Sequence, residues 1–567
     1  MIDVDVVVVG AGFSGALMAL GLRAQGQRVA LVERGRHPRF AIGESSTPLA
    51  NLLLEEIADR YSLPRVRTFS KWGTWQRSHP DVGCGLKRGF TFLFHTPGEP
   101  FVDTAAHTRQ LMVAASPHDE IADTHWYRPD FDYALAREAE AAGAIYLDET
   151  RIDAVRLDRR VSVLDGVRHG QPVRIGARFI VDASGPRGFL HRALALEEAA
   201  LRHLPPTEGL FTHFEGVERW DRLNPPGGEP PYPPDDAALH HVFPGGWIWI
   251  LRFNNGITSA GAALTRKGAE TLGWHDAARG RRSPVGEGDW ERLLAGLPSV
   301  QAQFRQARPT LPFMHVPRLA YRSAVAGGSG WALLPSAAGV VDPLLSTGFP
   351  LTLLGVKRLL DVLGRTSPGE ERDAAVADYA QTTLRELEVT EQLVAALYAA
   401  MDDPPLFKRL SLVYFAAASF SETTRRLGRP ALAPGFLLEA HPRFGPELRA
   451  CARGALDLTR LRPSSVDGSA RSASQPPEHA RAERDRLFAR ISRLIEPFDT
   501  AGFLDTSRLD WFPVTADDLI ANAGKLDATV DEIDALLARC GFTTTDARRA
   551  SPHGSRSSVG SPTKTSA

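Results

Sequence analysis

Hydrophobic residues near the start of the chain form an almost unbroken run. Valine fills nearly all of positions 4–9, and glycines follow directly. A strand that is buried on both faces of a parallel sheet has this near-continuous apolar character. Residues 16–25 then have helical composition, and residues 28–32 return to a strand pattern. The beginning of the chain therefore predicts a β-α-β unit.

Further along the chain the hydrophobic pattern changes its period. Short apolar runs at 144–147 and 179–181 predict two more strands, and residues 246–253 and 258–264 predict strands of a mixed sheet. From 351 to 397 the composition is mostly helical. This succession predicts an α/β protein (α+β overall) with a mixed sheet in the middle of the chain and helices after it.

The composition also divides the chain into regions. A stretch rich in Ser, Ala, Gly and Pro has the character of a linker, and the Ser-, Arg- and Gly-rich end of the chain has that of a disordered tail. We therefore expect a first domain at 1–380 with an interleaved sheet at about 200–325, a helical region at 381–462, a linker at 463–477, a second helical region at 478–545 and a tail at 546–567.

Charge and cysteine content argue against several functional classes. The chain of 567 residues has a formal net charge of −1, so it lacks the basic surplus that binding to nucleic acid requires. Cys84, Cys451 and Cys540 are far apart and odd in number, and the His240-His241 pair is expected in a loop, so we predict neither a disulfide framework nor a metal site. No uncharged apolar stretch reaches the ~20 residues of a membrane span. We expect a cytoplasmic protein.

The loop after the first strand has the sequence of a dinucleotide-binding turn. Residues 10–15 read Gly-Ala-Gly-Phe-Ser-Gly, which matches G-x-G-x-x-G, and the next strand leads to Glu33. The three glycines permit a tight turn, a close approach of the pyrophosphate, and close packing of helix on strand. A carboxylate at position 33 suits the hydroxyls of a ribose and would repel a 2′-phosphate. We expect nucleotide contacts from Gly10, Gly12, Phe13, Ser14, Gly15 and Glu33.

Two later segments favour FAD over NAD as the dinucleotide. Residues 178–185 are a buried strand pattern that ends in acidic and small residues, and residues 331–348 are an apolar run that leads to the start of a helix. The N-terminus of that helix suits a flavin carbonyl or a small anion. We expect further cofactor contacts from Asp182, Ala183, Ser184, Asp342 and Gly348.

These three segments, in this order, resemble the aromatic-hydroxylase-like FAD superfamily and specifically its flavin-dependent halogenases. The resemblance covers about residues 4–360. Residues 39–48 resemble the R-F-x-I-G-E-S segment that lies along the flavin, residues 128–132 resemble an R-x-x-F-D element near the cofactor, and residues 342–348 resemble the D-P-x-x-S-T-G segment. The resemblance implies cofactor roles for Ser45, Ser46 and Arg128, and a halide site at Ser346, Thr347 and Gly348.

The active-site lysine of that family has two candidates in this chain. Residues 87–92 resemble the family's K-x-G-x-x-F segment, with Lys87 as the lysine and Phe92 completing the pattern. Lys71 lies nearer the usual distance from the Gly-Glu-Ser segment. We assign the catalytic role to Lys87 and expect Lys71 to lie outside the cavity. On composition alone Lys87 would be a solvated surface lysine.

Two tryptophans resemble the start of the family's W-x-W-x-I-P signature. Trp247 and Trp249 alternate, so both face one side of a strand. They serve there either as core packing or as a wall that separates the flavin from the substrate.

The chain also departs from the family at three places. Leu251-Arg252 stands in place of Ile-Pro, and Pro335-Ser336 replaces a Gly-Asp pair that contacts the ribityl chain. Leu345 occupies the position of a glutamate in the tryptophan halogenases. This last difference argues against free tryptophan and favours phenol- or pyrrole-type substrates.

The resemblance implies both a fold and a reaction. The fold is an aromatic-hydroxylase-like FAD-binding Rossmann domain with an interleaved mixed β-sheet substrate domain and a C-terminal helical region. Reduced FAD and oxygen form a C4a-hydroperoxide, which oxidises chloride or bromide to hypohalous acid for transfer to an electron-rich substrate. That substrate is a small-molecule or carrier-tethered aromatic. A separate flavin reductase is expected because the chain has no second complete nucleotide fingerprint.

Three other functions remain open on the sequence. An FAD-dependent monooxygenase on the same scaffold would hydroxylate its substrate. A flavin-dependent reductase of isoprenoid double bonds shares the fold and needs no halide pocket. A degenerate flavoprotein would serve as a binding module, and Pro335-Ser336 and Arg252 are the residues that favour this last function.

Overall fold

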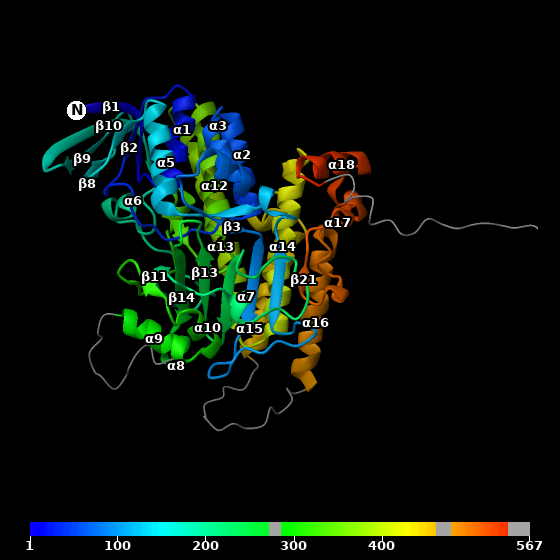
Figure 1. Cartoon of the computed structure of the whole chain (residues 1–567). Coiled ribbons are helices and arrows are strands. Elements are labelled where there is room, and N and C mark those ends of the chain that lie inside the picture. Colours follow the sequence, from blue (N-terminus) through cyan, green and yellow to red (C-terminus); the bar gives the residue numbers. More distant parts are fainter. Residues whose placement is uncertain (272–284, 461–477, 543–567) are drawn as a thin grey trace, which may run out of the picture.

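The computed structural model describes residues 1–271, 285–460 and 478–542, which form two large β-sheets covered by helices and two small two-stranded sheets (Figure 1). The predicted linker at 463–477 and the predicted tail at 546–567 lie outside the described residues.

The first sheet is built on parallel strands from the start of the chain. β1 (Ile2–Val9) pairs in parallel with β2 (Val29–Val32) on one side and with β10 (Gln171–Asp182) on the other. β7 (Ile145–Leu147) extends the sheet beyond β2, and β19 (Trp331–Leu333) extends it beyond β10. The antiparallel members of this sheet are β8 (Thr150–Arg156), β9 (Ser162–Arg168) and β18 (Gly327–Gly328).

Helices cover the first sheet and connect its strands. α1 (Phe13–Ala24) links β1 to β2 and packs against α5 (Arg128–Ala141) and α12 (Gly348–Arg365). Nearly all of α1 is buried, because it is enclosed by the sheet and by these two helices. The β-α-β unit expected from the valine run is therefore present, with β1 beginning two residues earlier than predicted.

The second sheet is mixed and combines strands from distant parts of the chain. Its central members are β11 (Thr207–Glu215), β12 (Ala238–Phe243), β13 (Gly246–Arg252) and β14 (Thr258–Thr265). The edge beyond β11 carries β15 (Arg308–Pro309) and β16 (Met314–Val316). At the other side, β12 pairs in parallel with β4 (Gly89–Phe94), and the order continues through β5 (Gln110–Ala114) to β21 (Trp511–Phe512).

This sheet corrects two expectations. The region 200–325 supplies only part of it, because the fully buried β4, the mostly buried β5 and the short β21 join from outside that range. The His240-His241 pair lies in β12 and not in a loop. Both histidines are buried between neighbouring strands, where the ring of His240 stacks on Phe92 with centroids 4.6 Å apart.

Long helices form the second half of the chain. They begin with α13 (Glu370–Ala399), α14 (Pro404–Arg426) and α15 (Phe444–Arg460), which pack on one another. α16 (Glu478–Ile495) lies along α14 and α15. The last described helices, α17 (Ala516–Ala521) and α18 (Val530–Arg539), lie on the same side of the molecule as α16 (Figure 1). Because β21 pairs with β5, this last segment is tied to the second sheet.

Shorter elements connect these layers. They are α2 (Pro48–Arg60), α3 (Pro64–Arg67), α4 (Trp72–Ser78), β3 (Cys84–Lys87), β6 (Asp123–Trp126), α6 (Phe189–Ala193), α7 (Trp220–Leu223), α8 (Arg266–Thr271), α9 (Glu287–Ala295), α10 (Pro298–Gln303), β17 (Tyr321–Arg322), α11 (Pro335–Ala338) and β20 (Gly339–Val340). Within the described ranges, no helix is both long enough and apolar enough to cross a membrane.

Candidate active site

A cavity of about 1010 Å³ opens where the parallel strands of the first sheet end. Val9 at the end of β1, Val32 at the end of β2 and Ala183 directly after β10 all line it. Ligands of open α/β sheets bind in the crevice outside the carboxyl ends of the strands. We call this space the larger cavity.

The glycine-rich loop forms one wall of the larger cavity. Gly10 has a φ of +104°, which a residue with a side chain rarely adopts, and a Cβ there would collide with the backbone of Ala183. Gly12 and Ser14 line the cavity beside the first turn of α1, whose amides lack acceptors within the helix. Gly15 lies behind this wall, where its missing side chain lets α1 approach the backbone of Gly10.

Glu33 lies at the end of β2 and also lines the larger cavity. Its Oε2 accepts hydrogen bonds from the Ala11 amide at 3.1 Å and from the Arg39 guanidinium at 2.9 Å, and Oε1 accepts one from the Gly35 amide at 2.9 Å. Burial by itself raises the pKa of Glu33, but Arg39 and the two amides lower it overall. Glu33 is therefore a carboxylate at the cavity wall.

Arg128 joins the glycine-rich loop to the segment that follows β2. Its guanidinium donates to both carboxylate oxygens of Asp132, at 2.7 and 2.8 Å, and to the carbonyl oxygen of Gly43 at 2.9 Å. Asp132 also accepts the amide of Phe13 at 3.1 Å. A buried bidentate pair of this kind fixes the relative positions of its neighbours. The two predicted motifs thereby share one wall of the larger cavity, which Arg128 and Ser45 also line.

The segment from Asp342 to Gly348 also contributes to the lining of the larger cavity. Asp342 accepts a hydrogen bond from the Tyr398 hydroxyl at 2.8 Å, and that hydroxyl accepts one from the indole of Trp247 at 3.0 Å. Burial raises the pKa of Asp342 to about 7, although the bond from Tyr398 opposes this shift. Trp247 and Trp249 both line the cavity, with ring centroids 5.5 Å apart.

Ser346, Thr347 and Gly348 line the larger cavity at the start of α12. Gly348 is the first residue of α12, so its amide belongs to the turn whose N–H groups have no acceptor within the helix. A Cβ added to Gly348 would have no described atom within 4 Å. This helix start is the part of the cavity best suited to a small anion.

Lys87 is completely buried at the end of β3. Its ammonium donates to Ser45 Oγ at 2.8 Å and to the carbonyl oxygen of Ser46, and it lies 3.8 Å from the centre of the Phe90 ring. Ser45 lines the larger cavity, whereas Thr47 and Phe90 line a second one. Lys87 therefore lies inside the wall between two cavities, and burial lowers its pKa to about 7 against the opposing effect of Asp123.

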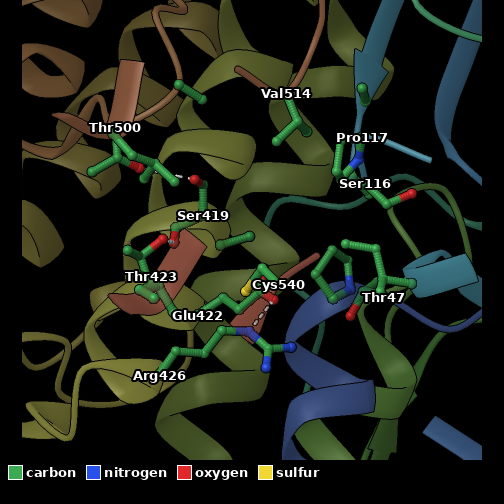
Figure 2. A pocket seen from close by; sticks show the side chains of 18 of the residues that line it. Thr47, Ser116, Pro117, Ser419, Glu422, Thr423, Arg426, Thr500, Val514 and Cys540 are labelled. Carbon is green, nitrogen blue, oxygen red and sulfur yellow. Dashed lines mark hydrogen bonds and ion pairs between the residues drawn. The ribbon is translucent and has the colours of Figure 1, made fainter. Parts of the chain in front are cut away.

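The second, smaller cavity has a volume of about 300 Å³ and is shown in Figure 2. One part of its lining is aromatic and comes from β4, α14 and the C-terminal segment; it consists of Phe90, Tyr414, Phe415 and Phe503. Another part is polar, with a hydrogen bond of 2.9 Å between Ser419 and Thr500 and an ion pair of 2.8 Å between Glu422 and Arg426 (Figure 2).

Sequence reasoning did not identify the residues of the smaller cavity. Most of them lie on α14 and beyond residue 500, outside the segments that resemble a known family. Lys71, which the sequence places outside the cavity, does not line the larger cavity but lines the smaller one and approaches Asp123 to 3.7 Å. Its side chain turns towards this buried carboxylate at the start of α4.

Two predicted cofactor residues lie behind the wall of the larger cavity. Asp182 is fully buried, and its carboxylate accepts the amides of Ser184 and Leu190 at 2.8 and 2.6 Å, so it shapes the loop after β10. Ser46 is also fully buried and donates to the Thr124 carbonyl at 2.7 Å. Neither side chain reaches the cavity surface, in contrast to Ala183 and Ser184.

The positions where the chain departs from the family have separate places in the structure. Ser336 lines the larger cavity at the start of α11. Arg252 points away from it and pairs with Asp235 at 2.9 Å. In the part of the chain that the structure describes, no cluster of three or more His, Cys, Asp or Glu is arranged to hold a metal ion.

Residues 5–339 match the family model "FAD dependent oxidoreductase". The chain is 30% identical over 423 residues to the tetracycline 7-halogenase of Kitasatospora aureofaciens, which covers 73% of each protein. It is 29% identical over 408 residues to the monodechloroaminopyrrolnitrin halogenase PrnC of Pseudomonas fluorescens, which covers 70% of this chain and 68% of PrnC.

The fold agrees with these similarities. The crystal structure of the halogenase PltM in complex with phloroglucinol and FAD superposes with a TM-score of 0.76 at 22% identity, over 89% of this chain and 99% of PltM. The protein is thus an enzyme of the FAD-dependent oxidoreductases. Within that class it belongs to the flavin-dependent halogenases, as the resemblance of its sequence motifs predicted.

Proposed function

We propose that the larger cavity binds reduced FAD and a halide, that the smaller cavity binds an electron-rich aromatic substrate, and that Lys87 transfers the oxidised halogen between them. The observation that carries this proposal is the position of Lys87, which contacts the lining of both cavities and is itself completely buried.

The residues of the larger cavity fit the parts of FAD. The turn at Gly10 and Gly12 and the start of α1 suit the pyrophosphate, and Glu33 suits the ribose hydroxyls. The wall that Arg128 holds in place follows the segment from Arg39 to Ser45, where the flavin end would lie. When bound, reduced FAD supplies the oxygen-activating chemistry that oxidises a halide.

The halide is assigned to the start of α12. Gly348 and its neighbours offer backbone amides and a helix N-terminus, and Trp247 and Trp249 limit the access of water to this end of the cavity. A chloride or bromide ion held there lies in the same cavity as the cofactor, so hypohalous acid would form close to the wall that contains Lys87.

Lys87 is placed to hold hypohalous acid by hydrogen bonding and to direct it to the substrate. Ser45 and Ser46 each accept a hydrogen bond from Nζ, which fixes this group. One position of Nζ is left for a ligand: an N–H donor in the ammonium form, or a lone pair that accepts the O–H of hypohalous acid in the neutral form. At the substrate, a ring carbon forms a bond to the halogen while the halogen–oxygen bond breaks, and the ring proton leaves with the hydroxide as water. This step is an electrophilic substitution and requires an electron-rich ring.

The smaller cavity favours a compact substrate. Its volume of about 300 Å³ is at the lower end of the range for small-molecule sites. Aromatic side chains on one part and the hydroxyls of Ser419 and Thr500 on the other match a ring with polar substituents, as in a phenol or a pyrrole. We therefore favour a free small molecule over a carrier-tethered one, with reduced FAD supplied by a separate flavin reductase.

The test uses the enzyme with FAD, a flavin reductase, oxygen and bromide, and a set of free phenols and pyrroles together with a carrier-bound pyrrole. We expect brominated masses from the free compounds. Lys87→Ala should still consume oxygen but should make no brominated product, whereas Lys267→Ala, a change at an exposed lysine of α8, should behave like the wild type. Products that gain oxygen instead of bromine, or unchanged bromination by Lys87→Ala, would overturn the proposal. Bromination of the carrier-bound compound alone would overturn the substrate assignment.

A further inference from the structure

A buried carboxylate lies directly opposite Lys87. β3 and β6 are antiparallel, and their register pairs Lys87 with Asp123. The side chains of directly paired residues lie on the same face of a sheet with neighbouring Cβ atoms. Lys87 and Asp123 have 0% and 1% of their surface exposed, so this pair is shielded from solvent on all sides.

Asp123 also faces a second lysine. Its Oδ1 accepts a hydrogen bond from the Asn51 amide at 2.8 Å and lies 3.7 Å from the Lys71 ammonium. Its Oδ2 is buried and forms no hydrogen bond with any residue of the described ranges. Asp123 therefore has two lysines as neighbours. Lys71 borders the smaller cavity and forms the ion pair, and Lys87 inside the wall is its partner in the strand register.

The charged forms of Lys87, Lys71 and Asp123 differ in how strongly burial disfavours them. With both lysines protonated and Asp123 ionised, the cluster carries one unpaired positive charge, and an unpaired buried charge is costly. Burial disfavours the charged form of Lys87, and the carboxylate of Asp123 favours it. Lys71 has 19% of its side chain exposed and keeps some contact with solvent. Burial therefore favours loss of the proton from Lys87.

The other titratable groups around this cluster do not replace Lys71 in that role. His125 on β6 and His240 on β12 are fully buried, and burial lowers the pKa of both far enough to keep them neutral. From α14, Glu422 adds negative charge that opposes ionisation of Asp123, and burial raises the pKa of Tyr414 above its usual value. Among the described residues, Lys71 and Lys87 are the cations whose charges lower the pKa of Asp123.

We propose that Asp123 and Lys71 are positioning residues that set the charge of Lys87. The Lys71 ammonium compensates the negative charge of Asp123, so that this carboxylate stabilises the ammonium form of Lys87 less and Lys87 stays close to neutral. This inference rests on the proposed function for its catalytic meaning, but the charge of Lys87 is a property of the protein alone. When Lys71 is replaced by a neutral residue, the negative charge of Asp123 is no longer compensated. It should then stabilise the ammonium form of Lys87. Replacing Asp123 by asparagine should have the opposite effect.

The experiment measures the pKa of Lys87 directly by NMR of the full-length enzyme labelled with ¹³C at lysine Cε, with no halide or substrate present. The chain has only seven lysines, so the signal that disappears in Lys87→Ala identifies Lys87. We expect the pKa of Lys87 to rise by about 1 unit or more in Lys71→Met and to fall by a similar amount in Asp123→Asn, because a charge at this distance shifts a pKa by that order.

Two further variants make the result specific. Lys71→Arg keeps the positive charge and should leave the pKa of Lys87 near the wild-type value, and Lys267→Met on α8 should do the same. An unchanged pKa of Lys87 in Lys71→Met would overturn the inference, as would an equal shift in Lys71→Arg. If Asp123→Asn fails to fold, the comparison of Lys71→Met with Lys71→Arg still tests the inference.

The pH profile of bromination then separates the two proposals. If both hold, the midpoint of product formation moves with the pKa of Lys87, upwards in Lys71→Met and not in Lys71→Arg. If the NMR shift occurs and the profile stays fixed, the charge relation is supported and the catalytic assignment of Lys87 fails.

Discussion

Replacing Tyr398 by phenylalanine removes the centre of a buried hydrogen-bond chain. The Tyr398 hydroxyl donates to Asp342 at 2.8 Å and accepts from the indole of Trp247 at 3.0 Å. Its loss leaves two buried polar groups without this partner, at a cost of about 1–3 kcal/mol each. We expect Tyr398→Phe to lower the free energy of unfolding by about 2–4 kcal/mol at pH 8. This value is in the lower part of the sum of the two costs, because Trp247 borders the larger cavity, where water can replace the lost partner.

The same change should depend on pH. Burial raises the folded-state pKa of Asp342 to about 7, and the hydrogen bond from Tyr398 holds it below the value that burial alone would give. Without the hydroxyl this pKa rises further. Below about pH 6 Asp342 is protonated in both folded proteins, so this contribution to the difference vanishes; above pH 7 the wild type ionises first and the difference grows. The loss of stability should therefore be larger at pH 8.5 than at pH 5.5.

Tyr379→Phe on the same helix is a matched control. Its hydroxyl is also buried, but it donates to the Leu333 carbonyl at 2.8 Å, which does not titrate. Denaturant unfolding at pH 5.5 and 8.5 should show a pH-independent loss of about 1–3 kcal/mol for this variant. The reasoning is refuted if Tyr398→Phe is as stable as the wild type at pH 8, or if both variants depend on pH in the same way.

Three other changes test separate parts of the two cavities. Glu33→Gln should weaken FAD binding by about 10- to 100-fold through the loss of a charged hydrogen-bond acceptor, measured by fluorescence titration; unchanged affinity in a folded variant would remove Glu33 from the site. Gly348→Val has room for its side chain beside α12, so it should fold and still consume oxygen with reduced FAD while losing most halogenated product; full product formation would move the halide elsewhere. Thr500→Val breaks the hydrogen bond to Ser419 and should raise the substrate KM several-fold at unchanged FAD affinity; weaker FAD binding instead would contradict the separation of the cavities.

Local patterns predicted the cofactor half of the molecule. Three local structures there are determined by residues that are close in sequence, so periodicity and motif spacing reveal them. They are the strand of the valine run, the turn from Gly10 to Gly15 and the helix start at Gly348. Which of these residues reach a cavity surface was less predictable. Asp182 follows the expected strand, yet its carboxylate is used by Ser184 and Leu190 within the loop.

The part of the molecule around the smaller cavity was not predictable in the same way because it depends on contacts between distant segments. β4 and β21 join the second sheet from parts of the chain that are distant from its central strands. Neither lies in the region 200–325, where hydrophobic and polar residues alternate most clearly. The position of Lys71 beside the smaller cavity was not predicted, because the carboxylate that it pairs with, Asp123, is remote in sequence. His240 was misassigned because a pair of histidines suggests a loop, whereas β12 buries it between β4 and β13.

The two cavities are completed at different points of protein synthesis. The last residue that lines the larger cavity is Leu387, whereas the smaller cavity also needs the segment from Thr500 to Phe542. A ribosome-bound chain that already contains every residue of the larger cavity therefore still has an open space where the smaller one will form. The sequence order places every residue of the larger cavity before the last residues of the smaller one, so a prematurely ended chain would keep the lining of the first and lose part of the lining of the second.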